Sequence, residues 1–172
     1  GNDGSACSTA QDPPGIYDAA FTIGSFSSTN ALANSSSRGA VTSDGSGRMK
    51  PDLSARGVSV RSAYRTNDTS YATMSGTSMA SPHVVGTVAL LWSARPNLVR
   101  DIPRTKWLLT RSANPSVTVS ANSSGCGGIG SVPNNHFGWG RVDALDAYNL
   151  EPSLNQSITF DAISDQTYGD AD

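Results

Sequence analysis

The sequence predicts an α/β layered fold whose sheet is mainly parallel. Two observations support this prediction: strand-like and helix-like segments alternate along the chain, and one long segment, residues 79–92, is almost wholly apolar or small. The 172 residues are 37% hydrophobic and 15% charged, which fits one globular unit with a modest core. The 17 glycines and the abundant Ser, Thr and Asn residues indicate many turns.

Strand-like segments dominate the first part of the chain. Residues 19–26 are predicted to form a buried strand, and the polar residues 27–37 are predicted to lie on the surface. A second strand is expected over 58–63 and a short third strand over 71–74, with a turn at Asn67-Asp68 between them. The third strand would deliver the chain directly to the apolar segment.

The apolar segment 79–92 predicts a helix that is buried on all sides. Gly76 and Thr77 precede it, and Arg95-Pro96 ends it because proline cannot continue a helix. Ser78 therefore lies in the first turn, where unpaired backbone N–H groups and the helix dipole favour developing negative charge. A hydroxyl there suggests acyl-transfer chemistry, although a lone serine at this position is also typical of a helix cap.

Two shorter helices are expected after the apolar one. Asp101 is suited to cap a helix running through residues 107–109, with Pro103 tolerated in its first turn. Asp143 is similarly placed to cap a short helix through residues 145–148.

The whole stretch 76–84, Gly-Thr-Ser-Met-Ala-Ser-Pro-His-Val, closely resembles the nucleophile motif of the subtilisin-like serine proteases. Other segments match the same family in the same order, and the resemblance covers almost everything from Gly1 to about Leu150. It implies a three-layer subtilisin-like fold over residues 1–150. The matching segments are the Gly-Asn loop 1–4, the pocket loop 14–17, the strand 21–24, the segments 35–39 and 49–53, and the closing motif 137–143.

By this resemblance, the chain would hydrolyse peptide bonds through an acyl-enzyme on Ser78. The oxyanion would be held by the Ser78 backbone N–H and the side-chain amide of Asn2. Neutral amide donors suit this task because they stabilise charge that appears only in the transition state.

The resemblance also assigns residues that border the substrate. These are Asp3, Gly4 and Asp12 on the pocket side, and Gly76 and Thr77 beside the nucleophile. Asp12 could pair with an Arg or Lys of the substrate, or it could simply precede Pro13-Pro14 in an exposed turn. A departure at 55–57, Ala-Arg-Gly in place of the family's usual Ala-Pro-Gly, puts the local turn geometry in doubt but touches no catalytic group.

The base and the orienting carboxylate of such a protease are not visible in this sequence. In the subtilisin order both precede the serine, and no histidine precedes Ser78 here. His83 is expected to be a packed, hydrogen-bonded structural residue, and His136 a solvated loop residue. We therefore interpret the sequence as the C-terminal half of a catalytic domain, expected to be inactive alone and partnered by the upstream half. The alternative is a non-catalytic secreted binding or adhesion module on the same scaffold.

Charge and cysteine content narrow the partners and the compartment. A net charge of −2 argues against binding to nucleic acid or acidic membranes, and no apolar run reaches the roughly 20 residues of a membrane span. Polypeptides are the expected substrates. A disulfide between Cys7 and Cys126 is the preferred interpretation, two unrelated thiols being the alternative, and such a bond would favour an extracellular protein.

Two further expectations concern a cation and the C-terminal residues. The chemistry requires no cofactor, but by resemblance the backbone carbonyls of Gly15, Tyr17 and Ala20 correspond to a weak family calcium site. Residues 151–172 are expected to be a linker and the truncated start of an immunoglobulin-like β domain, or a disordered polar tail.

Overall fold

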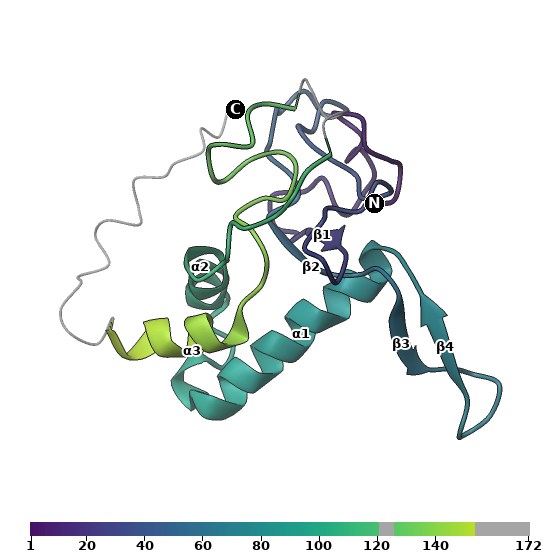
Figure 1. Cartoon of the computed structure of the whole chain (residues 1–172). Coiled ribbons are helices and arrows are strands. Elements are labelled where there is room, and N and C mark those ends of the chain that lie inside the picture. The colour runs from purple at the N-terminus through teal and green to yellow at the C-terminus, as the bar shows by residue number, and fades with distance from the viewer. Residues whose placement is uncertain (121–125, 154–172) are drawn as a thin grey trace.

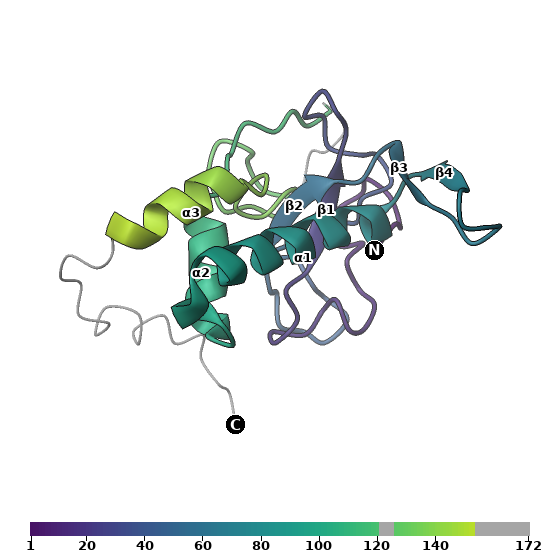
Figure 2. The same cartoon turned by 90° about the horizontal axis from the view of Figure 1, so that it is seen from below.

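The computed structural model describes residues 1–120 and 126–153. Within these residues the protein has a mixed α/β fold that contains two small sheets (Figures 1 and 2). Strands β1 (Ile23–Phe26) and β2 (Leu53–Arg56) pair in parallel, whereas β3 (Val60–Ala63) and β4 (Tyr71–Met74) form an antiparallel hairpin. The expected predominance of parallel pairing therefore holds for only one of these sheets.

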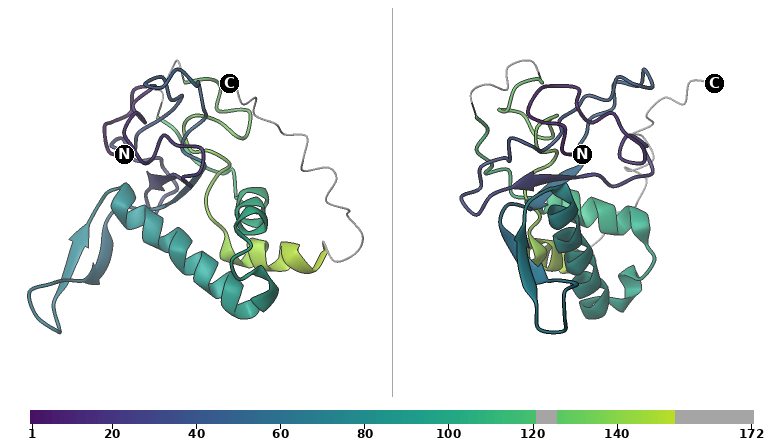
Figure 3. Two further views of the ribbon diagram at one scale, coloured as in Figure 1. Left: turned by 180° about the vertical axis from the view of Figure 1, so that it is seen from behind. Right: turned by 90° about the vertical axis from the view of Figure 1, so that its right-hand side faces the viewer.

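The helices follow in the expected order. They are α1 (Thr77–Ala94), a 3₁₀ turn η1 (Pro96–Leu98), α2 (Ile102–Arg111) and α3 (Ala144–Ser153). In the ribbon views, α1 runs from the hairpin beneath the parallel strands, and α2 and α3 lie against its far end (Figures 1 and 3). The linker and β-domain start, or polar tail, expected over 151–172 lies outside the described residues except for residues 151–153, which belong to the end of α3.

The parallel pair forms the centre of the core. All four residues of β1 and the first three of β2 are buried, as expected for parallel strands covered on both faces. The core cluster joins these strands to three helices and comprises Ile23, Leu53, Ala55, Ala80, Val84, Leu91, Leu109 and Ala147. The chain returns beside β2 at residues 140–142, where Ser54 N–H donates to Gly140 O and Val142 N–H donates to Ser54 O.

Two strands differ in extent from the prediction, and one was not predicted. Residues 17–20 make a turn, with Ala20 N–H donating to Tyr17 O, so the first strand begins only at Ile23. The second begins at Val60 because Ser59 takes a positive φ of 53°. Strand β2 escaped prediction because its four residues, Leu-Ser-Ala-Arg, carry a weak local signal.

The segment 27–37 is less exposed than its polar composition predicts. Leu32, Ser36 and Ser37 are buried. The Ser36 hydroxyl accepts from the Ser25 N–H of β1, so this segment satisfies backbone groups that a neighbouring strand would otherwise pair.

Helix α1 is not buried on all sides, which corrects the prediction from its composition. Val85 is 65% exposed and Leu90 is 66% exposed, although the helix contains no Asp, Glu, Lys or Arg. Only one face, through Ala80, Val84, Thr87 and Leu91, packs against the strands and the other helices. The opposite apolar face lacks a cover among the described residues.

Both predicted helix caps are confirmed. The Asp101 carboxylate accepts the Arg104 N–H at 3.0 Å at the start of α2. The Asp143 carboxylate accepts the N–H groups of Leu145 and Asp146 at 3.1 and 3.0 Å before α3. Each cap satisfies donors that the first helical turn leaves unpaired.

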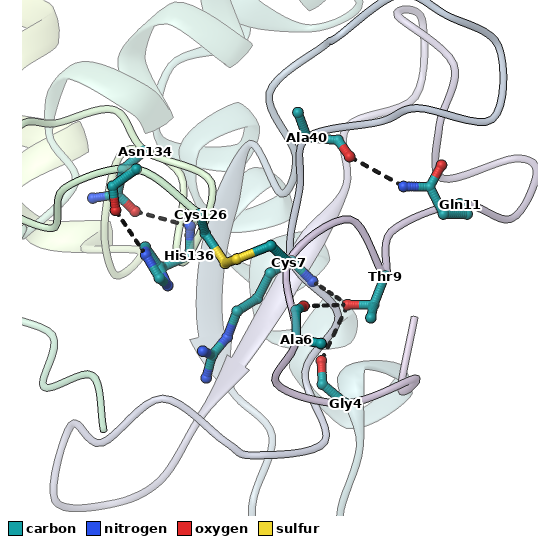
Figure 4. The surroundings of a disulfide bond; sticks show 11 residues. Gly4, Ala6, Cys7, Thr9, Gln11, Ala40, Cys126, Asn134 and His136 are labelled. Atoms are coloured by element: carbon teal, nitrogen blue, oxygen red, sulfur yellow. Dashed lines mark hydrogen bonds between the residues drawn. A yellow bond between two sulfur atoms is a disulfide. The ribbon is translucent and has the colours of Figure 1, made fainter. Parts of the chain in front are cut away.

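The predicted disulfide between Cys7 and Cys126 is present, with 5.0 Å between the two Cα atoms (Figure 4). Beside it, His136 is only 1% exposed, so the expectation of a solvated loop residue is wrong. The ring Nε2 of His136 contacts the Gly127 carbonyl at 3.2 Å, and the backbone N–H of His136 donates to the Asn134 side-chain oxygen. The disulfide joins the segment next to His136 to Cys7, a long-range contact that the polar sequence around His136 does not reveal.

Candidate active site

The N-terminus of α1 carries the serine that the sequence singles out. Gly76 is the N-cap with φ 151°, a conformation that favours glycine, and its N–H donates to Gly57 O at 2.8 Å. Ser78 is the second residue of the helix, so its N–H has no intrahelical acceptor. Its side chain is exposed. A hydroxyl and a free backbone donor thus lie together at the positive end of an 18-residue helix.

The Asn2 carboxamide reaches the same helix end from 75 residues away. Its Oδ1 accepts from the Thr77 N–H at 2.9 Å and from the Thr77 hydroxyl at 3.2 Å. Because the Thr77 N–H can only donate, the carboxamide oxygen must face the helix, and this fixes which end of the amide carries the NH₂ group. Nδ2 donates to no residue in the described ranges, and it is available to another acceptor.

Hydrogen bonds with residues 35–37 hold the segment that carries Asn2. Gly4 N–H donates to Ser35 O at 3.1 Å, and Ser37 N–H donates to Gly1 O at 3.0 Å. The Ser37 hydroxyl accepts the Asp3 N–H and donates to the Asp3 carboxylate. Asp3 therefore anchors the Asn2 segment in this structure, a task that its assignment to the substrate pocket did not include.

No hydrogen bond joins the remaining pocket-side residues, Gly4 and Asp12, to the helix end. Gly4 has a positive φ of 101° and open space where a Cβ would stand. Asp12 is exposed and forms no hydrogen bond or ion pair with the described residues. Burial lowers the pKa of the Gly1 amine, while the charges of Asp3 and Asp12 act in the opposite direction. Asp12 is thus near enough to influence Gly1, but no contact joins it to Ser78.

Neither histidine is placed to activate Ser78. The His83 ring contacts Met79 O at 2.9 Å within α1, as expected for a hydrogen-bonded residue, but it is exposed rather than packed. His136 lies beside the disulfide. Across residues 1–120 and 126–153, no histidine bonds to the serine hydroxyl.

Gly57 is a structural residue of this site that the sequence reasoning passed over. A Cβ at this position would lie 2.5 Å from Gly76 O and 3.0 Å from the Ala80 side chain. The glycine therefore allows the end of β2 to approach the start of α1. The signal was present in the sequence, because Gly57 is the last residue of the segment that corresponds to the family's Ala-Pro-Gly; the residue that departs from this pattern, Arg56, is exposed.

Other candidate sites do not compete with the helix end. In the part of the chain that the structure describes, no cluster of three or more His, Cys, Asp or Glu side chains could hold a metal ion. No helix there is long and apolar enough to cross a membrane. A pocket of about 500 Å³ lies elsewhere, between the end of α2 and α3, and no predicted site residue lines it; its lining is Arg111, Ser112, Ala113, Asn114, Pro115, Asp146, Asn149 and Leu150.

Comparisons with known proteins agree with this geometry. A model of the Subtilase family matches residues 1–140. The chain is 33% identical over 169 residues to the subtilisin-like protease SBT6.1 of Arabidopsis thaliana, which covers 96% of this chain and 15% of that protein. It is 35% identical over 108 residues to the extracellular serine proteinase of Thermus sp. (strain Rt41A), covering 53% of this chain and 24% of that protein.

A solved structure supports the same relationship. The Clostridium perfringens CspB protease superposes with a TM-score of 0.64 and 28% identity, covering 83% of this chain and 29% of that one. The chain therefore spans less than a third of the length of each of these proteins.

Proposed function

Because the chain belongs to the subtilase family of subtilisin-like serine proteases, we propose that it carries the nucleophile and the oxyanion hole of a serine endopeptidase. The proposal rests chiefly on one observation: the Asn2 carboxamide turns its oxygen to the Thr77 N–H, which leaves its NH₂ group without an acceptor among the described residues, at the helix end that carries Ser78. The Ser78 N–H provides a second donor at the same helix end.

In this proposal the Ser78 hydroxyl oxygen attacks the carbonyl carbon of a peptide bond. The negative charge that develops on the carbonyl oxygen is held by the Asn2 amide and the Ser78 N–H. The serine proton passes to a histidine base, which then protonates the leaving amine as the acyl-enzyme forms. Water subsequently hydrolyses the acyl-enzyme and regenerates the hydroxyl.

We further propose that the histidine and its aspartate come from an upstream part of the same protein. The exposed apolar face of α1 supports this view, because a helix that exposes Val85 and Leu90 and contains no Asp, Glu, Lys or Arg is suited to an apolar cover. A segment packed on that face would also bring its side chains toward the helix end that carries Ser78. Without that segment, the chain is expected to show little or no proteolysis.

The expected substrates are polypeptides, and the expected location is extracellular. The disulfide favours an oxidising compartment, since such bonds are rare in the cytosol. The match to a relative named as an extracellular serine proteinase points the same way.

A fluorophosphonate probe tests this function because it modifies only an activated serine. The full-length protein should be labelled once, at Ser78, as located by peptide mass spectrometry. The Ser78→Ala variant should stay unlabelled, and the neighbouring Ser81→Ala variant, also on α1, should be labelled like the parent. A folded full-length protein that the probe leaves unmodified would instead favour a non-catalytic binding or adhesion module.

A further inference from the structure

The loop over residues 15–20 offers the backbone carbonyls that the family resemblance assigns to a calcium ion. In this structure each of them already has a donor. The Thr22 hydroxyl donates to Gly15 O at 2.6 Å, the Ala20 N–H donates to Tyr17 O at 3.2 Å, and the Lys50 ammonium donates to Ala20 O at 2.7 Å. Calcium needs six to eight oxygens, and at Ala20 O the donor is itself a cation, so these carbonyls do not fit such an ion as they stand.

The Lys50 ammonium is unusual among these three donors because it is a buried charge. Its side chain is 2% exposed, and its Nζ lies 2.9 Å from the Asp52 carboxylate as well as 2.7 Å from Ala20 O. The same Asp52 oxygen accepts the Thr22 N–H at 2.6 Å. A positive group is thus surrounded by a carboxylate and a carbonyl, the two ligand types that calcium prefers.

Two further cationic side chains donate to the same loop. Arg48 Nη1 donates to Ile16 O, and Lys106 Nζ donates to Ala19 O at 3.1 Å. Carbonyls at residues 16, 19 and 20 therefore all face positive side chains. Arg48 also pairs with a carboxylate, that of Asp44. Lys50 differs from the other two cations because it is almost fully buried and because its carboxylate partner, Asp52, also accepts the Thr22 N–H of the same loop region.

We propose that the Lys50 ammonium replaces a structural calcium ion at this loop. It ties Ala20 to Asp52 through the protein's own charge, so the loop needs no metal. A divalent ion at the same oxygens would lie within a few ångströms of the ammonium, and the repulsion would be severe in a buried site. Removing the ammonium would leave the Asp52 carboxylate facing a carbonyl oxygen, which is an arrangement that invites a divalent cation. This inference does not depend on the catalytic role of Ser78.

The two lysines of this chain, Lys50 and Lys106, allow a test without mutation. The native full-length protein is treated with an amine-acylating reagent in chelator and in millimolar calcium, and each lysine is quantified by mass spectrometry. Lys50 should be acylated about 10-fold more slowly than Lys106, or slower still, because local opening must come first. Its rate should be the same in chelator and in calcium. Faster acylation of Lys50 in calcium would overturn the proposal, because it would mean that calcium displaces the ammonium.

Thermal unfolding of variants tests the latent cation site. Lys50→Ala should lower the Tm and should recover part of the loss with calcium, but not with potassium at the same ionic strength. Lys50→Met fills the space without a charge, so its Tm should fall without that recovery. Lys106→Ala removes the less buried ammonium and is the matched control, expected to respond to calcium like the parent. An identical calcium response in Lys50→Ala and the parent would contradict the proposed replacement.

Discussion

Asn2 and Ser78 define the candidate chemistry at the scale of single residues. Asn2 uses its oxygen to bind the start of α1 and keeps its NH₂ group for another acceptor. An amide can do both at once because its acceptor and its donors lie on separate atoms, whereas a carboxylate lacks the donor and a leucine lacks both groups. The two halves of this side chain can therefore be tested separately.

Replacing Asn2 with aspartate separates anchoring from oxyanion binding. Asn2→Asp keeps an acceptor for the Thr77 N–H and adds negative charge at a helix N-terminus, so the fold should persist. It loses the oxyanion donor, and kcat should fall by about 100- to 1,000-fold with KM little changed, a range measured within this family rather than derived from this structure. Steady-state kinetics on the full-length protein measure this split. Unchanged kcat would remove Asn2 from the oxyanion hole.

His136 shows how a buried ring couples stability to pH. Burial lowers its pKa, a hydrogen bond to Gly127 opposes this, and the nearby positive charge of Arg38 lowers it further. The net pKa lies below the ordinary value of about 6.5, so the folded state binds fewer protons than the unfolded state. The stability that the neutral ring provides is therefore complete above about pH 6.5 and is lost as the pH falls through the lowered pKa.

The variant His136→Gln should weaken this pH dependence because glutamine does not titrate. Urea unfolding at pH 7.5 and pH 5 should give the parent a larger loss of unfolding free energy on acidification than the variant. Other titrating groups contribute equally to both proteins. Equal losses in parent and variant would mean that the ring is protonated in the native protein without penalty.

Helix α1 is the element that links the core to the candidate site. One face packs on β1 and β2 and positions Ser78 at the helix end, while the other exposes Val85 and Leu90. Gly57 lets the strand end and the helix start approach closely, and Gly76 supplies the positive φ of the N-cap. The same element therefore fixes the serine and presents the apolar surface that the proposed upstream segment would cover.

Thiol accessibility can detect that cover in the full-length protein. A thiol at Leu90→Cys should react with a maleimide about 10-fold more slowly than one at Ser46→Cys, or slower still, since local opening would be required. Both thiols should react equally fast in urea. Equal rates in the native protein would show that the Leu90 face is open to solvent and would argue against the cover.

At the scale of the whole molecule, the Cys7–Cys126 disulfide joins distant parts of the chain. It closes a separation of 119 residues and secures the loop that contains His136. The Asn2 segment does not depend on it alone, because hydrogen bonds to residues 35–37 hold that segment as well. The disulfide should therefore matter more for stability than for the geometry at Ser78.

The double variant Cys7→Ser, Cys126→Ser tests this separation of roles. Its unfolding free energy should fall by about 4–5 kcal/mol in the chain-entropy model, as measured by urea unfolding of the full-length protein. Fluorophosphonate labelling of Ser78 should nevertheless continue at temperatures where the variant remains folded. Loss of labelling in a folded variant would mean that the disulfide also positions the site.

The sequence by itself determined the features that depend on neighbouring residues. It placed Ser78 in the first turn of α1, located strand β4, and assigned Asp101 and Asp143 as caps, because such features follow from hydrogen bonds within a few positions. The Cys7–Cys126 pairing was also preferred, since both cysteines lie in irregular segments rather than in apolar runs.

Only the tertiary structure decided which distant groups meet and which faces stay open. It brought the Asn2 amide to Thr77, buried His136, seated the Lys50 ammonium between Asp52 and Ala20, and left Val85 exposed. Each outcome depends on packing between segments far apart along the chain. Residue type and periodicity report what a side chain can do, but the partners that it finds are set by the path of the whole chain.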